Sequence, residues 1–308
     1  MVTLQDFLTD LTDLEKPVKF SGLLQFSDLP VEGVAEFKMN WLRLPVDRKH
    51  EIALKLVELA DENIELDFSS VFKACLQDDD EIVREMAVKG LWETEDRALI
   101  RPLVKLLEDD SSLKVRASAG ISLRNFAVMA QNGKLLSRDG DRIRDAFMKV
   151  ISQPDEDIEV RRRAIEAIAN FNTPETNDVI RDAYESNDLA LIQSAIYAMG
   201  QSSNPEWLTT VLDEMAHPSP AIRYEAATAG GLLGDEAVVS HLIRLLQDDD
   251  PEVSLASIKS LGQIGGLLAK RALQLCLSDG DESIEEAAQT ALANLEFNDD
   301  PLGFRFEP

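Results

Sequence analysis

Residues Asp80–Ala87 read DEIVREMA, and their spacing decides the fold because it returns along most of the chain. An apolar anchor, Val83 in this copy, recurs at intervals of 32, 45, 31, 31, 31 and 31 residues. The seven anchors are Val83, Val115, Val160, Leu191, Ile222, Val253 and Ile284. A nearly fixed period of this length is the signature of a repeat architecture, in which one structural unit is copied end to end.

The residues around each anchor indicate a helix that begins just before it. A small or apolar residue follows four positions later, as Ala87 follows Val83, which is a helical offset. Three positions before the anchors stand side chains that can accept hydrogen bonds from the free amides of a helix start. These predicted N-caps are Asp80, Ser112, Asp157, Asp188, Ser219, Asp250 and Asp281. Each unit is therefore expected to contain a helix A, an acidic turn and a helix B.

The helices A that precede these turns carry apolar stripes at i, i+3 and i+4, such as Leu242, Leu245 and Leu246. Their expected ranges are Ser70–Leu76, Leu99–Glu108, Arg142–Ser152, Asn177–Glu185, Trp207–Ala216, Ala237–Gln247 and Leu268–Leu277. Pairs of short helices cannot bury both faces alone, so neighbouring pairs must stack. The sequence thus predicts an all-α fold, a right-handed α-solenoid of about seven to eight stacked helix pairs in one elongated domain.

The repeat period also predicts how the chain is divided into segments. A step of 31 residues upstream of Val83 reaches Ile52, which places a degenerate capping repeat at about 31–62. The 45-residue interval contains an insertion at about 128–141, for which a lengthened helix B with a surface loop and a partner-binding loop are both open. The predicted division is an N-terminal arm at 1–28, the solenoid at 29–298 and a tail at 299–308. The arm is either two short helices or partly ordered, and the tail carries Phe304 and Phe306, which we expect to fold back over the last unit.

The net charge of the chain argues against some classes of partner. The chain has 57 acidic and 31 basic residues, a net charge of −26, which repels phosphate backbones and anionic lipid headgroups. This argues against nucleic acid and against a membrane surface. No run of 18 apolar residues is present, and acids stand where a signal peptide would carry Lys or Arg, so a cytoplasmic protein is expected.

The motif D-x-x-V-R-x-x-A at Asp80–Ala87 resembles HEAT repeats. Shorter matches are Val115-Arg116, Val160-Arg161 and Ile222-Arg223, and Leu261–Gly266 reads LGQIGG. The period and the Gly-rich helix ends are similar to the short HEAT-like repeats of phycobilisome bilin lyases and of bacterial HEAT scaffold proteins. The resemblance covers about residues 68–295 and implies the fold. It does not fix the activity, because that family includes scaffolds, lyase subunits, DNA glycosylases and metal-dependent hydroxylases.

The enzymatic members of the family can be tested against the sequence. Hydroxylases of this architecture hold two irons through repeated His-Glu pairs, whereas this chain has three histidines and only His50-Glu51 forms such a pair. The acidic cluster Asp279, Asp281 and Glu282 lacks the glycine of a calcium loop, since Ile284 stands in its place. Glycosylases use a basic surface, which the net charge opposes. We therefore expect no catalytic residue, no cofactor, no metal and no enzymatic activity.

An arginine follows four of the anchors directly. Arg84, Arg116, Arg161 and Arg223 recur at the unit spacing, while Ile192, Ser254 and Glu285 interrupt the series. In HEAT-like stacks such arginines usually bind the turn acids of a neighbouring unit. We interpret them as a structural ladder rather than as ligand-binding residues.

A partner is expected on the concave side, which helix B lines in such solenoids. Positions two and six after each anchor should face it, and they hold Glu85, Lys89, Arg162, Glu166, Gln193, Tyr197, Tyr224, Thr228, Leu255 and Lys259. Tyr197 and Tyr224, two of only three tyrosines, are candidates for a shared aromatic anchor. The leading hypothesis is a scaffold or adaptor that binds a protein or peptide through Tyr197, Tyr224, Arg162, Gln193 and Lys89. Two alternatives stay open: a bilin-lyase-like subunit or chaperone for a tetrapyrrole, implied by the resemblance alone, and an acidic chaperone for basic proteins.

Overall fold

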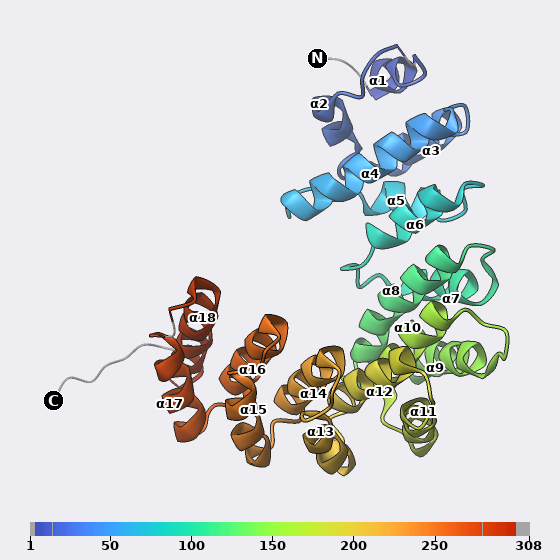
Figure 1. Cartoon of the computed structure of the whole chain (residues 1–308). Coiled ribbons are helices and arrows are strands. Elements are labelled where there is room, and N and C mark those ends of the chain that lie inside the picture. Colours follow the sequence, from blue (N-terminus) through green and yellow to red (C-terminus); the bar gives the residue numbers. More distant parts are fainter. Residues whose placement is uncertain (1–3, 14, 279, 300–308) are drawn as a thin grey trace. The chain divides into compact units, whose positions relative to one another are not determined.

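The computed structural model describes residues 4–13, 15–278 and 280–299, and the regular structure of these residues is helical throughout (Figure 1). They form 18 α-helices and five short 3-10 helices. Helices α3 to α18 alternate as helix A and helix B, which gives eight helix pairs. The predicted all-α stack of seven to eight pairs is thereby confirmed. The chain divides into two compact units, Met1–Ala167 and Ile168–Pro308.

In the first unit, two short helices precede the pairs and pack on them, α1 on α3 and α2 on α4. The helices are α1 (Leu4–Asp10), α2 (Phe20–Leu23), α3 (Val31–Trp41), α4 (Val46–Glu62), α5 (Ser69–Cys75), α6 (Glu81–Lys89), α7 (Ile100–Asp109), α8 (Leu113–Gln131), α9 (Ser137–Ser152) and α10 (Ile158–Ile168), whose last residue falls in the second unit. Helices A pack on helices A, as α7 does on α9, and helices B on helices B, as α4 does on α6. Buried Arg48 ties the N-terminal segment to α4, because its guanidinium donates to the carbonyls of Asp13 and Lys16 at 3.1 and 2.7 Å.

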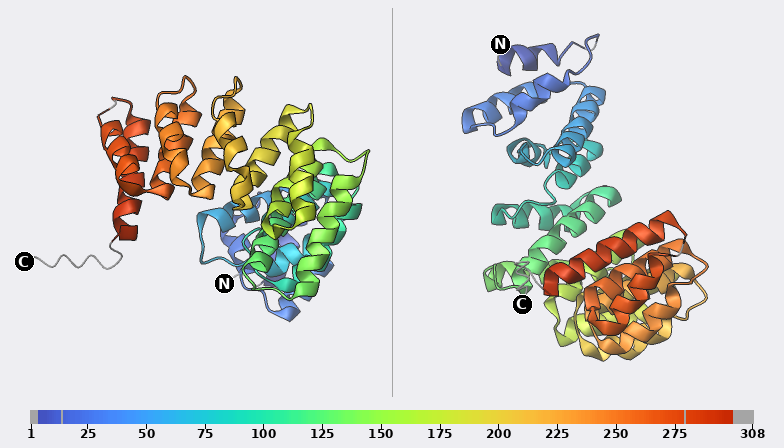
Figure 2. Two further views of the ribbon diagram at one scale, coloured as in Figure 1. Left: turned by 90° about the horizontal axis from the view of Figure 1, so that it is seen from below. Right: turned by 90° about the vertical axis from the view of Figure 1, so that its left-hand side faces the viewer.

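The second unit contains four pairs. Its helices are α11 (Pro174–Tyr184), α12 (Leu189–Gln201), α13 (Leu208–Glu214), α14 (Pro220–Leu233), α15 (Val239–Leu245), α16 (Pro251–Ile264), α17 (Gly266–Cys276) and α18 (Glu282–Asp299). The even-numbered members are helices B, and consecutive ones contact each other in the order α12, α14, α16, α18. They are seen side by side, from yellow to red, in the left view of Figure 2. The predicted tail, with Phe304 and Phe306, lies outside the described residues, apart from Asp299 at the end of α18.

The acidic turns begin helix B largely as predicted. Asp80, Asp188 and Asp281 accept hydrogen bonds from the amides two and three residues later, and Asp157 and Asp250 accept from the amides two residues later. The prediction was wrong for Ser112 and Ser219, which stand at the N-cap position without a side-chain cap. Their own amides donate to Asp110 Oδ1 at 2.9 Å and to His217 Nδ1 at 3.0 Å, as the amides of Asp80 and Asp250 do to Asp78 and Asp248.

The arginine ladder is present in three of its four predicted members. Arg84 binds Asp110 through two hydrogen bonds of 2.8 Å, and Arg223 binds Asp248 through two of 2.7 Å. The Nη2 of Arg116 lies 2.7 Å from Glu156 Oε1. In each pair the acid belongs to the turn of the next repeat, so the bond joins neighbouring repeats. Arg161 instead donates to carbonyls of its own turn, those of Gln153 and Pro154.

The extra residues after the second anchor are mostly helical. Helix α8 has 19 residues and α9 has 16, so both helices of this pair are long, and the connection between them is 132–136. Helix α9 begins at Ser137, five residues before the expected Arg142, and includes Gly140, which is buried. Much of the segment at 128–141 therefore extends helices rather than forming a loop.

Candidate partner-binding surface

Helices B of the second unit approach one another closely through small residues. Gly200, Gly231 and Gly262 stand 31 residues apart, each nine positions after its anchor. A Cβ atom added at Gly200 would lie 2.6 Å from the Cα of Ala229 on the next helix, and one at Gly262 would lie 2.8 Å from the Cβ of Ala291. Only glycine allows these distances, so the B helices form a closely packed row.

One face of this row is buried and the opposite face is open. Four positions after the anchors, Ala195, Ala226, Ser257 and Ala288 are fully buried. Positions two and six hold half-buried or exposed side chains, namely Gln193, Tyr197, Tyr224, Thr228, Leu255, Lys259, Glu286 and Thr290. We call these eight residues the B face. The sequence pattern predicted six of these eight residues to be accessible. The remaining two, Glu286 and Thr290, stand at the same offsets from the last anchor, Ile284.

The three predicted residues of the second unit belong to the B face on adjacent helices. Tyr224 of α14 is 37% exposed, while Tyr197 of α12 is half-buried and its hydroxyl accepts a hydrogen bond of 3.1 Å from Gln201. Gln193 of α12 donates to Glu225 of α14 at 3.2 Å, which fixes one helix against the other. Tyr197 is six and Tyr224 two residues past its anchor, so the two rings stand about one helical turn apart along the row.

The two remaining predicted residues lie in the first unit. Arg162 of α10 binds Glu159 Oε2 at 3.1 Å, and its side chain is 19% exposed. Lys89 of α6 binds Glu85 Oε1 at 2.6 Å across one helical turn. Both cations are therefore held by acids of their own helices. The structure brings Gln193, Tyr197 and Tyr224 together on α12 and α14, and it places Lys89 and Arg162 on helices of the other unit.

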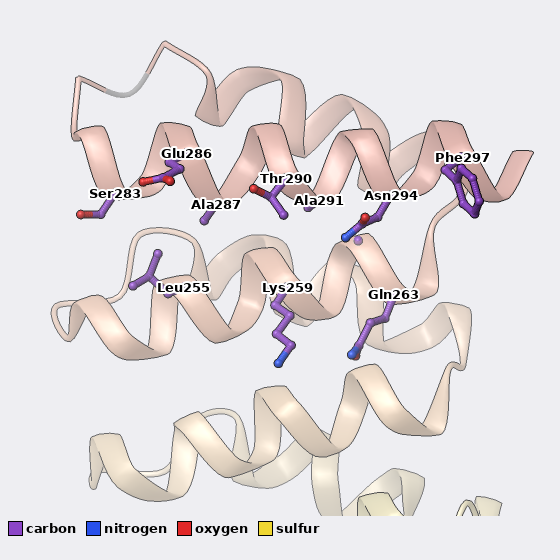
Figure 3. Close-up of a pocket in the computed structure, with 11 residues that line it drawn as sticks. Leu255, Lys259, Gln263, Ser283, Glu286, Ala287, Thr290, Ala291, Asn294 and Phe297 are labelled. Atoms are coloured by element: carbon purple, nitrogen blue, oxygen red, sulfur yellow. The ribbon is translucent and has the colours of Figure 1, made fainter. Parts of the chain in front are cut away.

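A groove that the sequence did not predict lies between α16 and α18. Its volume is about 720 Å³, and Figure 3 shows the side chains that line it. Leu255 and Lys259 come from α16, and Glu286, Thr290 and Phe297 from α18. Four of these five are B-face residues, so the groove continues the B face at the end of the row. Phe297, which is 66% exposed, is the aromatic residue at its far end.

The electrostatic environment of this row is strongly acidic. Residues 168–308 carry 24 Asp and Glu against 7 Lys and Arg, whereas residues 1–167 carry 33 against 24. Lys259 is the lysine among the groove-lining residues, and Glu286 is the carboxylate. Cationic or neutral groups are therefore favoured next to the B face over anionic ones.

The described residues contain neither a cluster of metal-binding side chains nor a membrane-crossing helix. Within 4–13, 15–278 and 280–299 no group of three or more His, Cys, Asp or Glu side chains could hold a metal ion. Asp279, part of one acidic cluster of the sequence, is outside these ranges. In the described part of the chain, no helix combines the length and the apolar character needed to cross a membrane.

Solved structures of similar fold include a phycocyanin lyase. The complex of CpcE and CpcF from Nostoc sp. PCC7120 is 15% identical over 74% of this chain and 94% of that chain, with a TM-score of 0.52. E. coli YibA is 15% identical over 78% of this chain and 96% of that one, with a TM-score of 0.44. Human deoxyhypusine hydroxylase is 19% identical over 95% and 96%, with a TM-score of 0.36. At these identities the likeness to the lyase is one of fold.

Sequence comparison identifies the family. No curated protein matches the chain. The family model described as HEAT repeats matches residues 68–131, 144–216 and 207–293, which is more than half of the chain. Together with the alternating A and B helices, this match shows that the protein belongs to the HEAT-repeat family.

Proposed function

We propose that this protein is a non-enzymatic scaffold or adaptor that holds a protein or peptide partner on the B face. The observation that carries the proposal is the row of eight accessible side chains on α12, α14, α16 and α18, which ends in the groove between the last two helices. The row combines aromatic, aliphatic, amide and hydroxyl groups. Such a mixture suits a surface that buries apolar area and satisfies the hydrogen bonds of a peptide.

Tyr224 and Tyr197 are the residues that we expect to contribute most to partner binding. Tyrosine offers a large apolar ring and one polar atom at a low cost in side-chain entropy, and it is enriched among interface residues that dominate binding energy. Tyr224 exposes 37% of its surface although it belongs to a helix with a buried opposite side. Arg162 and Lys89 remain proposed contributors from the first unit, where a partner's carboxylate would have to compete with Glu159 and Glu85.

The chemistry of the B face supports binding over catalysis. The residues of the B face are Tyr, Gln, Thr, Leu, Lys and Glu. Catalysis by a nucleophile requires a base within hydrogen-bond reach of the nucleophile and a third group that orients the base. The hydrogen bonds of Tyr197 with Gln201 and of Gln193 with Glu225 connect neighbouring side chains of the helix row. They support a structural role for these polar groups in presenting the surface.

The test is a comparison of captured partners. Tyr197→Ala combined with Tyr224→Ala is expected to lower affinity for the partner at least tenfold, which corresponds to about 1.4 kcal/mol. Tyr184→Phe is the matched control, because Tyr184 is the third tyrosine and donates to Glu214 at 2.5 Å, away from the B face. Quantitative mass spectrometry of proteins captured by the three forms, followed by calorimetry with the leading candidate, gives the answer. If the double variant captures the same proteins with the same affinity, the proposal is wrong.

Two other roles predict different results in simple assays. An acidic chaperone would lose affinity steeply between low and physiological salt, because its binding would be electrostatic, whereas aromatic anchoring changes little. A tetrapyrrole-handling subunit would change the visible absorption of a bilin on mixing. The first result would favour the net charge over the tyrosines as the source of binding, and the second would replace the scaffold proposal.

A further inference from the structure

Helix α17 exposes three leucines on the side opposite its buried residues. The helix, seen beside α18 in Figure 1, packs on α15, α16 and α18, and its Ala269 and Leu273 are buried. Leu267, Leu268 and Leu275 are between 63% and 78% exposed. Because the helix turns once in about 3.6 residues, Leu268 and Leu275 lie two turns apart on one face, and Leu267 borders that face.

These leucines do not serve the stacking of repeats. The corresponding positions of α15, α13 and α11, found in steps of 31 residues, are exposed in all three helices and are mostly polar. They hold Arg244, Asp213 and Asp182 in place of Leu275, and Ala237, Glu206 and Glu175 in place of Leu268. Because α11, α13 and α15 are each followed by another repeat, packing of a next repeat leaves these positions open. The leucines of α17 therefore need an occupant from outside the stack.

The charge of α17 is opposite to that of its unit. The helix contains Lys270 and Arg271 and no acid, although acids outnumber bases by 24 to 7 in residues 168–308. Arg271 comes four residues after Leu267, three after Leu268 and four before Leu275, so it stands among the three leucines. Arg271 is exposed, and no ion pair joins it to another residue within 4–13, 15–278 and 280–299. We call Leu267, Leu268, Arg271 and Leu275 the α17 face.

A cleft next to the α17 face can take up one apolar side chain of an occupant. Its volume is about 420 Å³, and Ile264, Leu267, Lys270 and Leu295 are among the residues that line it. Leu267 belongs to both the cleft and the α17 face. An apolar lining with one lysine suits an aliphatic side chain that has a carboxylate close by.

The α17 face also indicates the conformation of its occupant. The backbone N–H and C=O groups of α17 are used within the helix, so the face offers side chains alone. An extended peptide buried there would leave backbone groups unpaired, whereas a helix pairs its own. Leu268 and Leu275 are about 10.5 Å apart along the axis, which matches apolar residues seven positions apart on a partner helix.

We propose that α17 is a second docking surface, and that it binds an acidic amphipathic helix of a partner protein. Aliphatic residues of that helix pack on Leu267, Leu268 and Leu275, and a carboxylate between them binds Arg271. A short helix stays within the α17 face, and a screening length of about 8 Å at physiological salt limits repulsion by the acids of the rest of the unit. An anionic membrane extends past the face and meets those acids.

The inference goes beyond the proposed function, because α17 is a helix A and contributes no residue to the B face.

The test uses full-length protein and a synthetic helix. The probe is the fluorescein-labelled peptide EALEALLEALEALLEALEALL, which carries leucines on one face and glutamates beside them. Binding is measured by fluorescence anisotropy. The double variant Leu268→Gln and Leu275→Gln should bind the probe at least tenfold more weakly than the native chain. Leu189→Gln is the matched control, because Leu189 is an exposed leucine of α12, outside the α17 face.

A reversal of charge tests the acidic character of the occupant. Arg271→Glu should weaken binding of the glutamate probe at least tenfold, and it should strengthen binding of a second probe in which lysine replaces every glutamate. Arg244→Glu is the matched control, because Arg244 is an exposed arginine of α15 at the position that corresponds to Leu275. Thermal unfolding followed by circular dichroism shows that each variant is folded.

Several outcomes would overturn the assignment. A native chain that does not bind the glutamate probe, or that binds it no better than the leucine double variant, has no such site on α17. Equal affinity of the native chain and Arg271→Glu for this probe contradicts the acidic character of the occupant. Binding to phosphatidylcholine vesicles that contain phosphatidylserine, if the leucine double variant abolishes it, assigns the α17 face to a membrane surface instead.

A concentration-dependent dimer in sedimentation experiments that the leucine double variant abolishes would assign the α17 face to a second copy of the chain. The double variant Tyr197→Ala and Tyr224→Ala separates this proposal from the proposed function, because it should lose the partner of the B face and bind the glutamate probe as the native chain does.

Discussion

At the scale of single residues, charged pairs join one repeat to the next. The Asp248 carboxylate is 7% exposed, and the hydrogen bonds from the Arg223 guanidinium hold its pKa below the usual 3.8, while partial burial opposes this and the Asp250 amide adds to it. Because the pKa is lowered in the folded state, the charged pair stabilises the protein above the unfolded pKa. That contribution is lost as the pH falls through the lower, folded pKa.

Asp248→Asn should therefore reduce the free energy of unfolding at pH 7 by about 1.5–3 kcal/mol, the range for hydrogen bonds to charged groups, since it leaves Arg223 with a weaker partner. The difference between native and variant proteins should shrink as the pH falls below about 4, where unfolded carboxylates bind protons. Urea unfolding between neutral and acid pH, followed by circular dichroism, measures both. Asp249→Asn is the control, because it removes the same charge from an exposed neighbour. A difference that stays constant with pH would contradict the assignment to this pair.

Capping of a helix by an aspartate was predictable, because it depends on one short side chain. The aspartates before the anchors cap their helices because a carboxylate reaches the amides two residues later. Ser112 and Ser219 stand at the same position of the pattern, yet their side chains do not cap. The side chain two residues earlier accepts from the N-cap amide at these serines and equally at Asp80 and Asp250, so that bond does not explain the difference. Periodicity cannot separate these cases, because serine and aspartate both suit the N-cap position of the pattern.

At the scale of helices, close packing of helices B depends on glycine. Gly200 faces the backbone of Ala229, and Gly120 of α8 has more room, with its nearest neighbour at 3.4 Å from an added Cβ. Alanine favours a helix over glycine by about 1 kcal/mol, so the same substitution should have opposite signs at these two sites.

Gly200→Ala should destabilise the protein by about 1–3 kcal/mol, because the added methyl group forces α12 away from α14. Gly120→Ala should be neutral or stabilising by up to about 1 kcal/mol, because it gains helix propensity without a severe clash. Thermal and chemical unfolding of both variants compare them directly. Stabilisation by Gly200→Ala would show that the two helices are not packed as closely as the structure indicates.

The ends of helices were less predictable than their existence. Asp139-Gly140-Asp141 looks like a turn in sequence, yet these residues belong to α9 and Gly140 is buried there. Packing of α9 against α7 and α8 overrides the low helix propensity of glycine. The turn lies earlier, at Gly133, whose φ of +69° suits glycine.

At the scale of the whole molecule, the repeat period predicted which positions of α12, α14, α16 and α18 are accessible, but it was wrong for Glu166 of α10, which is buried at the same offset. The period does not predict how far apart the helices are. Offsets two and six past the anchors identify members of the B face, since they depend on helix geometry alone. The groove depends on the spacing between α16 and α18, which follows from the contact of Gly262 with Ala291 and from the side chains that surround it. Such a spacing is a property of packed volumes and is not visible in a periodic pattern.

The net charge of −26 makes a further prediction for the whole chain. Exposed acids such as Asp79 and Asp249 repel one another over long distances, while pairs such as Arg223 with Asp248 are partly buried and feel salt less. The screening length falls from about 30 Å at 10 mM salt to about 8 Å at 150 mM. Repulsion should therefore weaken more than attraction, and the melting temperature should rise by a few degrees over this range. Thermal unfolding in a sodium chloride series measures the change. A fall in melting temperature would mean that exposed ion pairs, rather than repulsion among the acids, dominate the electrostatics of the stack.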